Sequence, residues 1–194
     1  MRRVLVIDDH ESSRRDLVNI LLQRGYEIVG EGSSGKLALT LARTATPDVM
    51  LMAVGLADLD GIQAASEILA TYHLPIVLIT SHYDAMTVER ATKAGVMALL
   101  LKPVRADAVS PAIELAISRF KDFLALQQEN ESLKENLESR KIIERAKGLL
   151  MEQRRLSEEQ AYSLIKKTSM NMRKPMADVA QAILLAAEID QQNK

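Results

Sequence analysis

The stretch PDVMLMA at residues 47–53 predicts a buried strand and decides the fold of the N-terminal part of the chain. Its residues Val49–Met52 are apolar without interruption, which is typical of a strand that helices cover on both faces of a parallel sheet. Together with three similar runs and one weaker run, it predicts five strands. The other runs lie at 4–7, 76–79 and 97–101, and the weaker one lies at 27–30.

Segments with a helical spacing of apolar residues separate these strands. Gly25 follows the first segment and Gly95 follows the fourth, where a left-handed helix end favours glycine. Strands that alternate with helices indicate an α/β domain with a doubly wound, five-stranded parallel sheet. The predicted helices are 12–23, 34–43, 61–71 and 84–93.

Polar side chains stand at several strand ends, and one strand end lacks such a side chain. The acidic pair Asp8 and Asp9 follows one strand, Thr80 ends another, and Lys102 follows a third, whereas Ala53 ends the strand at 49–52. In doubly wound sheets the functional crevice lies beyond the carboxyl ends of the strands. We therefore expect these residues to converge on one pocket, with a methyl group where the surroundings call for a carboxylate.

The bulk composition excludes several classes of protein. Of the 194 residues, 47% are hydrophobic and 26% are charged, which is ordinary for one or two soluble domains. The chain has no cysteine, so disulfides and cysteine metal sites are excluded. No apolar stretch reaches the roughly 18 residues that span a bilayer, and the N-terminus enters a strand without a signal-peptide run. We expect a cytoplasmic protein without membrane contact.

The net charge of −1 conceals an asymmetry between the two parts of the chain. Residues 1–138 carry 14 basic and 19 acidic side chains, whereas residues 139–194 carry 11 basic and 7 acidic ones. A basic excess permits a polyanion as partner. On charge alone, a solvated helical surface explains it equally well.

A helical pattern begins at Ala106 and continues toward the C-terminal part of the chain. From residue 123 its seam residues recur at alternating steps of three and four, which is the period of a coiled coil. An asparagine in this seam favours a parallel two-stranded register, so we expect a homodimer. A single long helix packed on its own protein is the alternative. The seam residues are Phe123, Leu126, Asn130, Leu133 and Leu137.

Three short helical segments follow, at 140–153, from Ser157 to about residue 170, and from Pro175 onward. The string SEEQ at 157–160 fits a capping box, and proline suits a first helical position. Together the three segments can close a small three-helix core. The predicted boundaries are 1–118 for the α/β domain, 119–138 for the coiled-coil helix and 139–194 for the three-helix domain.

The α/β domain resembles the receiver domain of bacterial response regulators. The resemblance lies in VLVIDD at 4–9, PDVMLM at 47–52, Asp60-Gly61, Ile79-Thr80 and LKP at 101–103. It implies the flavodoxin-like receiver fold and a phosphorylation pocket. In an active receiver the position of Ala53 carries the phosphoacceptor aspartate. The resemblance further implies that Asp8 and Asp9 help to hold Mg²⁺, that Thr80 bonds the phosphoryl group, and that Lys102 pairs with it.

The chain departs from the receiver pattern at Ala53, at Leu99, where receivers have Tyr or Phe, and at Ala57, where they have Pro. A methyl group cannot attack phosphorus, so no acyl phosphate can form at position 53. Magnesium also loses an anionic ligand, so we expect at most weak Mg²⁺ at Asp8 and Asp9, and no other cofactor. Ala53 is either natural or an engineered silencing change of an ordinary two-component regulator; Leu99 and Ala57 favour a naturally degenerate receiver.

The C-terminal part resembles the ANTAR domain of antitermination regulators, through RKIIERAKGLLM at 140–151, SEEQAY at 157–162 and Ser169-Met170. This resemblance implies a dimeric RNA-binding regulator. It would bind paired hairpin loops in leader transcripts and prevent formation of a terminator. The basic residues that we expect to contact RNA are Arg145, Lys147, Arg173, Lys141 and Lys174.

Other functions remain open at this stage. The degenerate receiver could be a docking module for a sensor or kinase protein that sequesters the helical tail. A DNA-binding regulator is less favoured, because no helix-turn-helix string stands out. An enzyme is least favoured, because no nucleophile is paired with a base.

Overall fold

The computed structural model describes residues 1–192, and the side chains up to Glu188. The chain divides into two compact units between Leu124 and Ala125, which differs from the boundary at residue 118 that we predicted. Helix α5 (Ala106–Arg154) contributes residues to both units. None of the described helices has the length and hydropathy needed to cross a membrane.

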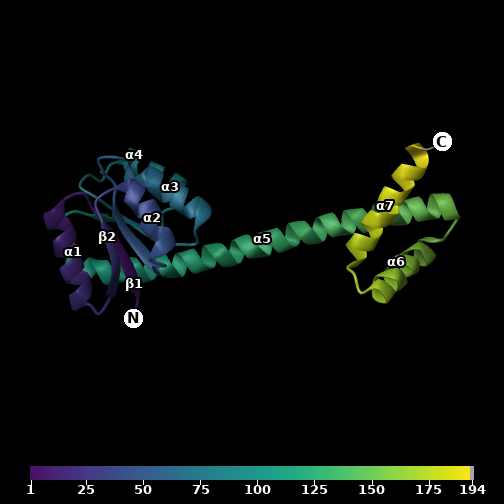
Figure 1. The fold of residues 1–194 in the computed structure, drawn as a ribbon, viewed down its shortest axis with the longest axis horizontal. Coiled ribbons are helices and arrows are strands. Elements are labelled where there is room, and N and C mark those ends of the chain that lie inside the picture. The colour runs from purple at the N-terminus through teal and green to yellow at the C-terminus, as the bar shows by residue number, and fades with distance from the viewer. Residues whose placement is uncertain (193–194) are drawn as a thin grey trace. The chain divides into compact units, whose positions relative to one another are not determined.

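The first unit contains a five-stranded parallel sheet in the order β2-β1-β3-β4-β5 (Figure 1). This confirms the predicted doubly wound α/β fold, because a sheet of this order carries helices on both of its faces. The strands are β1 (Arg3–Ile7), β2 (Glu27–Gly32), β3 (Val49–Ala53), β4 (Ile76–Thr80) and β5 (Ala98–Leu101).

Helices α1 to α5 cover the two faces of this sheet. Because side chains alternate along a strand, Val4 and Val6 of β1 pack toward α1 and the start of α5, while Leu5 and Ile7 pack toward α2, α3 and α4. Each face thus has its own apolar cluster, which explains the uninterrupted apolar runs. The helices are α1 (Glu11–Gln23), α2 (Gly35–Thr44), α3 (Gly61–Thr71) and α4 (Ala85–Lys93).

The ends of these helices follow the local sequence closely. Gly25 and Gly95 have φ angles of 81° and 82°, the left-handed geometry that favours glycine after a helix. Ser34 and Asp84 accept hydrogen bonds from backbone N–H groups at the starts of α2 and α4. The predicted helix bounds therefore agree with the structure to within one residue.

The second unit packs the C-terminal part of α5 with α6 (Glu158–Met172) and α7 (Met176–Gln192). Its core holds Ala146, Leu150, Ile165 and Ala180, and Ser157 with Gln160 forms the predicted capping box. The segment at 140–153 that we predicted as a separate helix is the end of α5. The reason is local: no glycine or proline interrupts the chain between 112 and 147.

Gly61 offers a test of how tightly the site-forming turn is packed. A Cβ at Gly61 would meet the carbonyl group of Ala53, whereas a Cβ at Gly55 in the same connection would meet nothing within 4 Å. We predict that Gly61→Ala lowers the free energy of unfolding by about 1–3 kcal/mol through overpacking, while Gly55→Ala changes it little. Urea denaturation followed by circular dichroism measures both. Equal losses in the two variants would contradict this account of the turn.

Candidate functional site

The carboxyl ends of the strands carry four of the five positions that we predicted to share a pocket. Ala53 and Thr80 end β3 and β4, while Asp8 and Lys102 directly follow β1 and β5. Asp8, Ala53 and Thr80 are buried, with exposed fractions of 1%, 2% and 6%. A cavity of about 380 Å³ lies against Ala53, Thr80 and Lys102, and His10 also lines it. The side chain of Ala53 contributes only a methyl group to this cavity.

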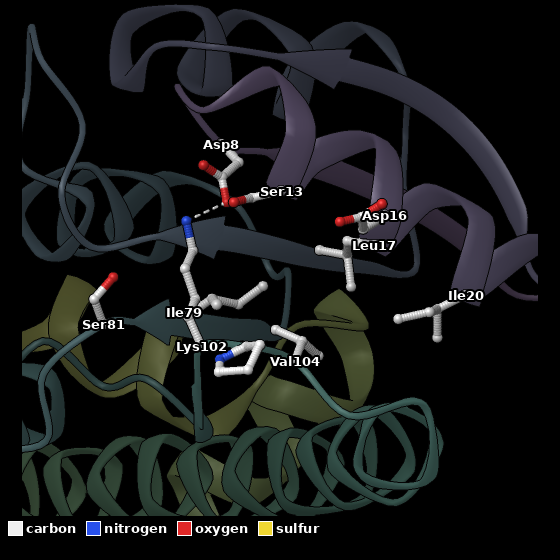
Figure 2. A pocket seen from close by; sticks show the side chains of 10 residues that line it. Asp8, Ser13, Asp16, Leu17, Ile20, Ile79, Ser81, Lys102 and Val104 are labelled. Atoms are coloured by element: carbon white, nitrogen blue, oxygen red, sulfur yellow. Dashed lines mark ion pairs between the residues drawn. The ribbon is translucent and has the colours of Figure 1, made fainter.

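Asp8 and Lys102 form an ion pair at the strand ends, in which the Asp8 carboxylate is buried and the Lys102 side chain is 19% exposed (Figure 2). The distance from Lys102 Nζ to Asp8 Oδ2 is 2.6 Å, and the other carboxylate oxygen of Asp8 accepts a hydrogen bond of 3.0 Å from the backbone N–H of His10. A buried carboxylate without such partners would be strongly unfavourable. Both oxygens of Asp8 are therefore satisfied within the protein.

The side chain of Asp9 contacts His10 rather than Lys102. Its Oδ1 lies 2.8 Å from Nδ1 of His10, and its side chain is partly exposed. Asp8, Asp9 and His10 offer ligand atoms within 4.8 Å of one another, but Ala53 adds no oxygen, and Lys102 already neutralises Asp8. Magnesium requires several oxygen ligands in near-octahedral geometry. These residues therefore fit that ion poorly.

The Thr80 hydroxyl forms hydrogen bonds within the turn that follows β4. Thr80 Oγ1 donates a hydrogen bond of 2.9 Å to the backbone carbonyl of His82 and accepts one of 3.2 Å from the N–H of His82. The hydroxyl thus closes the turn after β4 and has no free proton for a ligand in this arrangement.

Two further acids near position 53 are helix caps. Asp58 accepts hydrogen bonds from the N–H groups of Gly35 and Lys36 at the start of α2, at 2.8 and 3.2 Å. Although desolvation opposes ionisation, these bonds hold the pKa of Asp58 below its ordinary value. Asp60 accepts from the N–H of Ile62 at 2.9 Å and caps α3. Neither carboxylate is free to replace the missing acceptor.

A second hollow of about 330 Å³ adjoins the ion pair on the α1 side. Figure 2 shows Leu17 and Ile20 of α1 facing Val104 across it, with Lys102 at its inner end and Asp16 on its α1 side. The hollow is therefore mostly apolar, with charged groups at its edge.

In the second unit, the structure corrects our prediction for Lys147. Its side chain is only 8% exposed, and its Nζ lies 2.9 Å from Glu144 and 2.7 Å from Glu158. The hydrogen bonds that Lys147 donates to Glu158 and to Glu144 raise the pKa of Lys147, and the same contact lowers the pKa of Glu158. Lys147 links α5 to α6 and is not available as a phosphate contact.

The other expected RNA-contacting residues lie at the surface. Lys141 pairs with Glu138 at 2.7 Å, whereas Arg145 forms no ion pair with a described residue. Arg173 and Lys174 are exposed in the turn between α6 and α7, where Arg173 has a φ of 53°. The sequence reasoning did not select Arg154, which lines a groove together with Lys174.

The fold and the strand-end residues together define a receiver-type domain, which is joined to a small helical domain. The family model of the response regulator receiver domain matches residues 4–114, and that of the ANTAR domain matches residues 131–184. The chain belongs to the response regulators, and it combines a receiver domain with an ANTAR domain. Both are regulatory rather than enzymatic modules.

Similar proteins agree with this assignment. The chain is 44% identical over 183 residues to the transcriptional regulatory protein PdtaR of Mycobacterium tuberculosis, covering 94% of this chain and 89% of that protein. It is 37% identical over 113 residues to the response regulator protein VraR of Staphylococcus epidermidis, covering 57% of this chain and 54% of that protein. Among solved structures, the signal receiver domain of a modulated diguanylate cyclase from Desulfovibrio desulfuricans superposes with a TM-score of 0.59 at 34% identity, covering 62% of this chain and 97% of that chain.

We predict that Lys147→Ala destabilises the C-terminal unit, because it removes a buried stem and the hydrogen bond to Glu158 that joins α5 to α6. The melting temperature of this unit should fall by on the order of 5 °C. Arg145→Ala, an exposed cation on the same helix, should leave it nearly unchanged. Calorimetry of the full chain measures both, and equal melting temperatures for Lys147→Ala and the unchanged protein would contradict the structural role.

The pH dependence gives a further check on this link. The pKa of Glu158 is lowered from 4.5, so its contribution is present above that pH and is lost as the pH falls further. The pKa of Lys147 is raised from 10.5, so its contribution is present below that pH and is lost as the pH rises further. The destabilisation by Lys147→Ala should therefore be constant between these limits and shrink beyond them.

Proposed function

We propose that this protein is an RNA-binding antitermination regulator that acts as a homodimer and is not controlled by phosphorylation of its own receiver domain. The observation that carries the last part is Ala53, which stands beside an ion pair in which Asp8 and Lys102 satisfy each other. The ANTAR match at residues 131–184 supports the RNA-binding part.

The argument against phosphorylation is chemical. An acyl phosphate forms when a carboxylate oxygen attacks phosphorus, and Ala53 provides no such oxygen. The neighbouring acids have other partners, since Asp8 binds Lys102 while Asp58 and Asp60 cap helices. The signal that controls this regulator must then come from a protein partner, from dimerisation or from RNA itself.

The distribution of charge supports a polyanion as the partner of the C-terminal unit. Residues 139–174 carry 10 basic and 4 acidic side chains. Neutralising phosphates provides affinity without sequence information, whereas RNA sequence is read mostly on unpaired loop bases. Hairpin loops in leader transcripts fit both requirements.

The middle of α5 supports the homodimer. Every side chain at residues 125–138 is exposed, so no described residue packs on this part of the helix. Leu126, Leu133 and Leu137 are 66%, 62% and 55% exposed, and they lie on the predicted seam with Asn130. An unsupported helix of this length is marginal in water, and a second copy would bury the seam.

A docking role of the receiver is the second candidate, and several exposed apolar side chains favour it. Tyr83 and Met86 near the start of α4 are 67% and 70% exposed, and Leu101 at the end of β5 is 51% exposed. Exposed apolar side chains of this size on one domain are suited to a sensor or kinase partner. The two functions are compatible.

Phosphorylation control is tested by incubating the full chain with acetyl phosphate and Mg²⁺. We expect no phosphoprotein in intact-mass spectrometry and no change in RNA affinity, because position 53 has no acceptor. The matched variant Ala53→Asp restores an acceptor and serves as the positive control. A phosphoryl adduct on the unchanged chain would refute the proposal, and an aspartate codon at position 53 of the natural gene would mark Ala53 as engineered.

The dimer and its RNA target are tested together. We predict that Leu126→Glu combined with Leu133→Glu makes the protein monomeric in sedimentation equilibrium, whereas Gln128→Glu, away from the seam, leaves it dimeric. In gel-shift titrations, the monomeric variant should bind a leader with two hairpins at least tenfold more weakly and a single hairpin equally well, because only avidity is lost. A failure of the unchanged protein to bind leader RNA would overturn the RNA-binding function.

A further inference from the structure

The C-terminal unit contains a groove of about 430 Å³ between the end of α5, α6 and α7. Its walls include Leu150 of α5, Leu164 of α6 and Val179 of α7, whereas Ala182 and Ala186 of α7 contribute only methyl groups. Its volume lies in the range of sites that bind small ligands. The groove is thus an apolar slot in a domain that is otherwise a small closed core.

The edge of this slot is polar and mainly basic. Arg154 and Lys174 line it from the end of α5 and from the α6–α7 turn, and both are exposed. Neither forms an ion pair with a described residue. Gln153 and Asp178 also line the groove. Two cations beside an apolar slot are complementary to a flat ring attached to a polyanionic chain.

We propose that this groove takes one unstacked base from the loop of an RNA hairpin, with the adjoining phosphates held by Arg154 and Lys174. The inference rests on the proposed RNA-binding function and assigns its base-reading surface. Unpaired RNA bases splay out and insert their faces against side chains, while cations hold the backbone. An apolar peptide helix would need none of these cations, so the charge favours RNA as the occupant.

Asp178 gives the groove a preference for one kind of base. Its carboxylate accepts hydrogen bonds only, so it favours a base that presents an exocyclic amino group. Uracil has no such group, and its single donor, N3–H, is flanked by two carbonyl oxygens that the carboxylate would repel. The groove should therefore discriminate against uracil at the inserted position.

Helix α5 has two sides that could contact RNA, and the groove lies on only one of them. Arg145 and Arg154 lie nine positions apart, which is two and a half helical turns, so they project from opposite sides of the helix. Arg145 therefore does not belong to this groove. The comparison of these two arginines distinguishes the groove from the opposite face of α5.

The experiment uses the full-length protein and a hairpin chosen by selection from RNA hairpins with a randomised loop. Ala182→Leu fills the groove from α7, and Gln181→Leu adds the same side chain to α7 outside the groove lining. Thermal melts by circular dichroism establish that both variants are folded. Fluorescence anisotropy at several salt concentrations then gives the affinity and the salt slope.

We expect Ala182→Leu to weaken binding of the selected hairpin about tenfold or more with an unchanged salt slope, because a base contact is lost and phosphate contacts remain. Gln181→Leu should bind like the unchanged protein. Arg154→Ala and Lys174→Ala should each reduce the salt slope by about one, whereas Arg145→Ala should not. Replacing the inserted base by uracil should weaken the unchanged protein but not Ala182→Leu.

Two outcomes overturn the inference while the proposed function stands. One is normal hairpin binding by Ala182→Leu together with weak binding by Arg145→Ala, which would place RNA on the opposite face of α5. The other is unchanged RNA binding together with a changed oligomeric state of Ala182→Leu in sedimentation, which would make the groove a protein interface. If the unchanged protein binds no hairpin from the pool, the proposed function itself fails.

Discussion

The ion pair between Asp8 and Lys102 is the interaction on which the arrangement of the strand ends in the receiver domain depends. It connects the ends of β1 and β5, and because β3 and β4 lie between these strands, it crosses the positions of Ala53 and Thr80. With a methyl group at position 53, the amine of Lys102 has Asp8 as its anionic partner at 2.6 Å. The two charges therefore neutralise each other at the strand ends.

The polar side chains at the strand ends have partners within the protein, whereas other surfaces of the molecule are exposed. The Thr80 hydroxyl and the carboxylates of Asp58 and Asp60 stabilise turns and helix starts, so these polar groups have structural roles. What remains unpaired lies elsewhere among the described residues: the apolar seam of α5, the exposed side chains near α4, and the basic groove of the C-terminal unit. Exposed surfaces of this kind are suited to binding partners, which is the form of control that we propose for this protein.

The fold could be predicted because its signals are local. Uninterrupted apolar runs, Gly25 and Gly95 at helix ends, and the capping box at Ser157 each reflect the conformation of a few neighbouring residues. The prediction of a separate helix at 140–153 was wrong, because no local signal in the sequence marks a helix start there. Helix α5 continues through this segment. The convergence of the strand ends followed from the rule for doubly wound sheets, but the partner of each side chain did not.

Lys147 shows where sequence reasoning reaches its limit. A lysine in a basic segment has the same sequence signature whether it faces solvent or a neighbouring helix, and only the packing of α5 against α6 places it between Glu144 and Glu158. Arg154 and Lys174 likewise become neighbours of one groove only after the three helices have closed. The sequence alone determined the elements, their order and the absence of a nucleophile at position 53, because these are properties of single residues and short periods. The tertiary structure decided which charges are satisfied and which are free, because that depends on contacts between segments distant in the chain.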